Sequence, residues 1–201
     1  LVVEEVVVGA THPIDLICSW IKDSSSLIAL DAPLGWPVEL GESLKTHLAG
    51  QAIPVEGNQL FRRATDRFVK NKLGKQSLDV GADRIARTAL WAVNFVESLS
   101  QVIREPIPLV WSASVVNPIA AIEVYPAASL ISRDLALRGY KKTENIEVRA
   151  EILAGLESEV RIKCNHSDIV ATDDALDSVV CALAGYDFLN NKCYEPGDLE
   201  L

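Results

Sequence analysis

The sequence lacks the features of a membrane protein, of an exported protein and of a protein that coats nucleic acid. No apolar run approaches the roughly 18 residues that a membrane span needs. Residues 1–10 carry glutamates where a signal peptide would carry lysines. The net charge of −9 disfavours bulk electrostatic attraction to nucleic acid or to a membrane surface. We therefore expect a cytoplasmic protein without a membrane partner, to which nucleic acid can still come as a substrate through a local basic patch.

Paired metal-ligand spacing of cysteine and histidine is absent as well. The four cysteines show no CxxC spacing, and no histidine is paired with them; the histidines are His12, His47 and His166. Cys18 and Cys181 lie in apolar helical patterns, which indicates buried thiols in a reducing compartment. These absences disfavour a zinc site.

The domain organisation follows from length and pattern. A chain of 201 residues with 49% hydrophobic content can bury a substantial core, which favours one domain over 1–201. Between residues 38 and 117 the pattern changes to helical segments without a convincing buried strand, namely 40–48, 59–73 and 82–103. We therefore predict a helical insertion at 38–117 within a single domain.

The central strand is predicted at residues 27–30, which form an unbroken apolar run. The run stops at Asp31 because Pro33 holds the residue before it extended. Asp31 should therefore lie at the carboxyl end of the strand, where open α/β sheets place their sites. The alternative is that Asp31 only caps the following turn.

The segments before this strand predict how it is reached. Residues 1–8 are a β-branched run interrupted by Glu4 and Glu5, which indicates a partly exposed strand. Apolar residues then recur at helical spacing over 11–22. A strand, helix, strand order of this length predicts a right-handed parallel crossover.

Basic side chains that can hold phosphate occur in two places. In the predicted helix 59–73, Arg63 and Arg67 share a face, with Asp66 beside them. Lys141 and Lys142 lie in a basic loop at 139–143. Arginine holds phosphate in a fork of donors, but a charged face is more often solvated and paired internally, and exposed lysines often serve only solubility.

Glu123 lies inside an apolar strand predicted at 120–128. A buried carboxylate needs a cation, a hydrogen-bond donor or solvent at the end of the sheet. A site role is favoured over a simple buried ion pair.

The last strong element is a helix predicted at 172–188, with Thr172 as its cap. Asp174 and Asp177 share a face that continues into small and apolar residues, so we expect this face to rest against protein. The helix dipole favours acids in the first turn, which explains Asp174 better than the deeper Asp177.

Three separated segments thus supply carboxylates that a parallel sheet can bring together: Asp31, Glu123, and Asp174 with Asp177. Clustered acids repel unless a cation neutralises them, and oxygen ligands suit Mg²⁺ or Mn²⁺. We predict Asp31, Glu123 and Asp177 as metal ligands and Asp174 as an assisting catalytic residue. Such ions can activate water in phosphodiester cleavage.

Four motifs, in order, carry a family resemblance: IALDAPLGWP, RRATD, EVYPAASL and DDALDSVVCALAG. Together they resemble the predicted RNase H-like nuclease family catalogued as domain of unknown function 429, over residues 26–185. The resemblance implies an α/β, RNase H-like mixed sheet flanked by helices, with the helical insertion between the Asp31 strand and the Glu123 strand. It also implies a two-metal carboxylate site, to which the insertion contributes Arg63 and Asp66.

One feature of the RNase H-like pattern is missing from these motifs. Such enzymes also use an Asp on their first strand. Asp15 lies in the first predicted helix and Asp23 in a loop, so neither corresponds to it.

The expected function is that of a metal-dependent nuclease or phosphodiesterase in which Arg63, Arg67 or Lys142 holds phosphate. An actin-like nucleotide hydrolase or phosphotransferase would need glycine-rich phosphate loops, which neither Gly35 nor Gly81 provides. A catalytically silent binding module, with its acids paired to internal arginines, is the other alternative.

Overall fold

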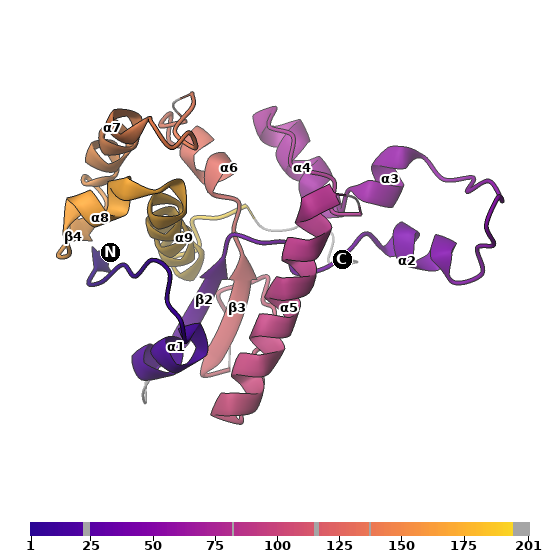
Figure 1. The fold of residues 1–201 in the computed structure, drawn as a ribbon, viewed down its shortest axis with the longest axis horizontal. Coiled ribbons are helices and arrows are strands. Elements are labelled where there is room, and N and C mark those ends of the chain that lie inside the picture. Colours follow the sequence, from indigo (N-terminus) through magenta and orange to yellow (C-terminus); the bar gives the residue numbers. More distant parts are fainter. Residues whose placement is uncertain (22–24, 82, 115–116, 137, 195–201) are drawn as a thin grey trace. The chain divides into compact units, whose positions relative to one another are not determined.

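A computed structural model describes residues 1–21, 25–81, 83–114, 117–136 and 138–194 (Figure 1). The protein is mixed α/β, built from helices and short parallel sheets. It divides into two compact units, of which the first unit comprises residues 1–31 and 99–194 and the second unit comprises Ala32–Ser98. The single domain with an insertion at 38–117 stays a prediction, and each unit is described by itself.

The first unit contains two parallel sheets of two strands each. β2 (Ser26–Leu30) pairs with β3 (Ile119–Glu123), in a register that places Leu30 beside Glu123. The chain around residue 109 lies along β3 as well, because the Val110 amide donates to the Ala121 carbonyl at 3.0 Å. Asp31 and Glu123 therefore leave their strands at the same edge.

The first strand does not join this sheet. β1 (Val2–Val3) pairs in parallel with β4 (Arg161–Ile162), so the predicted crossover from the first strand to the central strand is wrong. The glutamates that follow β1 explain the difference, because they keep this segment at the surface. Glu4 Oε1 forms an ion pair with Lys163 Nζ at 2.8 Å.

The helices of the first unit build its core. They are α1 (Pro13–Ile21), α6 (Pro126–Ile131), α7 (Ile146–Leu156), α8 (His166–Ala171) and α9 (Asp173–Leu189). The fully buried residues Leu130, Ile152, Ile169 and Leu176 come from α6, α7, α8 and α9 and form one cluster. Burying each such side chain contributes about 1.5–3 kcal/mol.

Helix α9 packs against β2. A Cβ atom on Gly185 would lie 3.6 Å from Leu27 Cδ2 and 3.7 Å from Ala29 Cβ, so the helix backbone lies directly over the strand. The helix predicted at 172–188 is confirmed with nearly the expected bounds. The packing brings the start of α9 to the edge at which β2 ends.

The second unit is helical in its described residues. It contains α2 (Val38–Leu44), α3 (Gly57–Phe61), α4 (Ala64–Leu73) and the first part of α5 (Asp83–Ile103). The helix predicted at 59–73 is two helices, because Arg62 is extended (φ −128°, ψ 127°) and Arg63 is the N-cap of α4. None of the helices in the described residues is both long and apolar enough for a membrane span.

Candidate active site

Two predicted site residues meet at the end of the β2–β3 sheet. Asp31 directly follows β2, and Glu123 is the last residue of β3. The Val124 amide donates to the Leu30 carbonyl at 2.8 Å, which continues the pairing up to both acids. As the sequence predicts, the carboxylates lie at the carboxyl edge of parallel strands, where open α/β sheets place their sites.

Helix α9 supplies the third acid. The Thr172 hydroxyl accepts from the Ala175 amide at 3.1 Å, which caps the helix and fixes its start. Asp177 lies one turn further on and is only 2% exposed, whereas Asp174 is exposed. A buried carboxylate requires partners.

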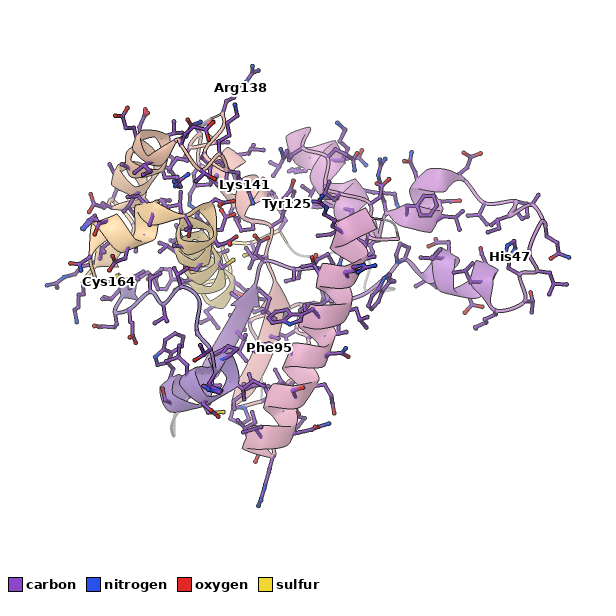
Figure 2. The ribbon with its side chains drawn as sticks, viewed as in Figure 1. His47, Phe95, Tyr125, Arg138, Lys141 and Cys164 are labelled. Carbon is purple, nitrogen blue, oxygen red and sulfur yellow. The ribbon has the colours of Figure 1, made fainter. Side chains whose placement is uncertain are left out.

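Asp177 finds both its partners on the loop between α6 and α7. The Tyr140 hydroxyl donates to Asp177 Oδ1 at 3.1 Å. Lys141 Nζ lies 2.7 Å from Asp177 Oδ2, in a close ion pair that lacks the angles of a well-directed hydrogen bond. Figure 2 shows Lys141 on this loop. Its side chain is 51% exposed, so the ammonium group reaches the buried acid from the solvent side.

The electrostatics connect these groups into one carboxylate–lysine cluster, which we define as Asp31, Glu123, Asp174, Asp177 and Lys141. The pKa of Asp31 is raised to about 6, mainly by desolvation; Lys141 opposes this rise, and Asp177, Asp174 and Glu123 add to it. Asp31 is exposed at the surface. The protein around its carboxyl group nevertheless displaces part of the water that would stabilise the charged form. Three distant parts of the chain therefore act on one titrating group.

The pKa values of Asp177, Lys141 and Tyr140 are all raised. Desolvation raises the pKa of Asp177 and outweighs the contacts from Lys141 and Tyr140, which lower it. Desolvation opposes the charge of Lys141, but contact with Asp177 and nearby carboxylates overcome it and raise its pKa. Burial, and then Asp177, raise the pKa of Tyr140. Lys141 is therefore charged and Tyr140 neutral at neutral pH.

The donor atoms of the cluster are of the chemical type that a hard divalent cation prefers. All four acids offer carboxylate oxygens, which Mg²⁺ and Mn²⁺ prefer. The pKa of Asp31 is raised first by desolvation and then by repulsion from the other three carboxylates, and a bound cation would relieve that repulsion. Among the described residues, no three His, Cys, Asp or Glu side chains are arranged as ligands of one ion, and the ammonium of Lys141 is the cation in contact with Asp177.

The predicted site residues of the insertion lie together in the second unit. Arg63 forms a two-pronged pair with Asp66, in which Nε and Nη2 each donate at 3.0 Å. Asp66 also accepts from the Arg63 amide at 2.9 Å, which completes a capping box at the start of α4. Arg67 donates to the Arg62 carbonyl at 2.7 Å. These contacts correspond to the alternative of internal pairing.

The loop residue that reaches the acids is Lys141 rather than Lys142. The role of Lys142 in holding phosphate stays a prediction; its side chain is exposed, and its carbonyl accepts from Arg149 Nη1 at 2.8 Å. Tyr140 and Arg149 are site residues that the sequence patterns do not predict. Arg149 could have been noticed, because it occupies the apolar stripe of α7 three and four residues before Ile152 and Leu153.

A family match covers nearly the whole chain. The family model described as "Protein of unknown function (DUF429)" matches residues 9–200. The chain belongs to this family. Every residue of the carboxylate–lysine cluster in this DUF429 protein lies inside the matched range. No curated protein and no solved structure matches the chain.

Proposed function

We propose that this DUF429 protein is a metal-dependent hydrolase of phosphodiester bonds, a nuclease or phosphodiesterase, with the carboxylate–lysine cluster as its active site. The observation that carries the proposal is the convergence of acids from β3 and α9 on one carboxyl group, that of Asp31 at the end of β2. Acids gathered around one partly desolvated carboxyl group are costly for a purely structural surface. They are typical of functional sites.

An RNase H-like arrangement of the first unit is part of the same proposal. It is supported by the four motifs in order and by the parallel pairing of β2 with β3 under α9. The sheets of the described residues have two strands each, so the proposal concerns the placement of the acids more than the size of the sheet. Fold alone would not assign the activity.

The chain's own residues have distinct proposed roles. Asp31, Glu123 and Asp177 would hold Mg²⁺ or Mn²⁺, and Asp174 would assist from the exposed start of α9. When bound, the ion supplies activation of water and stabilisation of the leaving oxygen. Tyr140 orients the Asp177 carboxylate through its Oδ1 atom. Lys141 balances the charge of the acids before a cation binds.

Phosphate binding belongs to the basic loop in this proposal. The half-exposed ammonium of Lys141 already lies at the acids, and Lys142 follows it on the same loop. A phosphodiester that approaches the cluster meets these charges first, which offsets its repulsion by the carboxylates. The predicted roles of Arg63 and Arg67 have less support, because their guanidinium groups already donate within the second unit.

A catalytically silent binding module is the second candidate. The ion pair between Lys141 and Asp177 favours it, because an internal cation already neutralises part of the cluster. The two candidates differ in their response to metal: a ligand that binds only the folded state raises the melting temperature. A silent module would show no such rise.

The deciding experiment is a melting scan with Mg²⁺ and Mn²⁺, coupled to cleavage of single- and double-stranded DNA and RNA. We expect metal to raise Tm and support cleavage, and Asp31→Asn to weaken both. Glu151→Gln is the matched control, since Glu151 is an exposed acid on α7 outside the cluster. Stabilisation by ATP with Mg²⁺ and no cleavage would instead indicate a nucleotide hydrolase. No response to either metal would contradict the proposal.

A further inference from the structure

Arg149 is an arginine in the core of the first unit. It lies on α7, is 0% exposed, and takes a place in the apolar stripe of that helix. Burying a guanidinium is costly unless all its donors are used and its charge is balanced. In the part of the chain that the structure describes, its hydrogen bonds go to backbone carbonyls and to no carboxylate. Its role is therefore not that of an ordinary ion pair.

All five N–H donors of Arg149 are used. Nε donates to the Val170 carbonyl at 2.7 Å, and Nη2 donates to the Ala171 carbonyl at 3.2 Å. The remaining three donors reach the carbonyls of Tyr140 at 2.8 Å, Lys142 at 2.8 Å and Thr143 at 3.2 Å. One planar group thus bonds to two separate backbone segments.

These two segments carry the two halves of the site. Val170 and Ala171 end α8, whose last carbonyls have no intrahelical partner, and Thr172 directly afterwards caps α9 and so sets the position of Asp177. The carbonyls of the other segment flank Lys141 on both sides. The contact from Lys141 to Asp177 joins the loop to α9, and the guanidinium joins the same loop to the end of α8, directly before α9 begins.

We infer that Arg149 is a positioning residue that holds the Tyr140–Thr143 loop against the start of α9, so that Lys141 meets Asp177. The inference rests on the proposed function only for the catalytic role of that pair. No other side chain supplies five donors in one plane. Lysine has three donors around a single atom, and glutamine has two, so either replacement leaves buried carbonyls without a partner.

Arg133 is a matched control. It is a second arginine of the first unit, partly buried where Arg149 is fully buried, and it bonds to Glu159 at 3.2 Å, to Asp187 and to the Ser129 carbonyl. It thereby connects α6 and α9 with the end of α7, as Arg149 connects α7 with α8 and the loop. None of its recorded bonds goes to the loop 139–143 or to the end of α8. Loss of Arg133 should cost stability without moving Lys141.

The test observes Lys141 directly, without metal or substrate. The ¹H–¹⁵N signal of the Lys141 ammonium, assigned with Lys141→Met, reports its ion pair with Asp177. We expect Arg149→Gln to abolish this signal and to speed amide exchange in the loop 139–143 by about tenfold or more, whereas Arg133→Gln changes neither. An unchanged Lys141 signal in folded Arg149→Gln would overturn the inference.

A second variant keeps the test decisive. Should Arg149→Gln not fold, Arg149→Lys retains the charge with fewer donors, and its Lys141 signal should weaken; an unchanged signal would again overturn the inference. With Mn²⁺ and a cleavable substrate, kcat should fall by about 10²-fold in Arg149→Lys at little changed KM. Absence of cleavage by the wild-type protein would contradict the proposed function but would leave the Lys141 signal to decide the role of Arg149.

Discussion

Lys141 Nζ lies 2.7 Å from Asp177 Oδ2, so an ammonium group that is half exposed neutralises a carboxylate that is almost fully buried. The two residues are far apart along the chain. Arg149 bonds to the loop that carries Lys141 and to the end of α8, which directly precedes the helix that carries Asp177. A divalent cation that bound Asp177 would compete with the Lys141 ammonium group for its carboxylate. The first prediction tests that competition.

Lys141→Met should destabilise the protein at neutral pH and strengthen its response to metal. The buried carboxylate loses its cation, at a cost of about 1–2 kcal/mol, between the values for exposed and buried pairs. Mn²⁺ should then raise Tm more in the variant than in the wild type, because no ammonium competes with it. Thermal melts with and without Mn²⁺ measure both effects. Lys142→Met is the control, and an equal metal response in all three proteins would contradict the competition.

Asp31→Asn should stabilise the metal-free protein at pH 7–8. The pKa of Asp31 rises from its ordinary 3.8 to about 6 on folding, so the folded protein holds its proton more tightly than the unfolded chain. The contribution of Asp31 to stability therefore falls as pH rises from about 4 to about 6, and stays low above that interval.

The gain from Asp31→Asn should accordingly shrink as pH falls toward 4 and vanish below the ordinary pKa of 3.8, where both states bind the proton. Urea denaturation across pH 4–8 measures it, with Glu151→Gln as the matched exposed acid. A gain in stability that is independent of pH would show that ionisation of Asp31 does not destabilise the folded protein.

Tyr140→Phe should cost about 1–3 kcal/mol, because it leaves one oxygen of the buried Asp177 carboxylate without its donor. The ring stays, so the packing is kept. Urea denaturation gives the loss, and Tyr186→Phe, at an exposed tyrosine on α9, is the control. Equal stability of Tyr140→Phe and the wild type would mean that water replaces the hydroxyl at Oδ1.

Gly139→Ala should disturb the basic loop. Gly139 has φ +83°, which costs an alanine about 1–2 kcal/mol, and the added Cβ would come within 2.8 Å of Asn145 Nδ2. Gly9→Ala is the matched control, because Gly9 has φ +69° with open space around it. The larger loss in Tm should occur in Gly139→Ala, together with weakening of the Lys141 ammonium signal. Equal losses would show that only backbone strain matters.

The sequence was sufficient to predict those features that depend on neighbours along the chain. The apolar run that ends at Asp31, the cap at Thr172 and the periodic helices 83–103 and 173–189 all follow from local patterns, and the structure confirms them. The acids at the end of β2 and β3 follow as well, since parallel strands end at one edge. Periodicity over ten or more residues carries enough signal for such predictions.

Tertiary structure alone decided which distant segments meet. β1 pairs with β4 and not with β2, and strands of two residues carry no period from which a partner can be chosen. Lys141 and Lys142 are equivalent in sequence, and the bonds that place the loop, from Arg149 to the carbonyls on either side of Lys141 and from Tyr140 to Asp177, bring Lys141 to that acid. Contacts between distant residues produce no periodic pattern in a sequence. The fold was therefore needed to identify Lys141 as the partner of the buried Asp177.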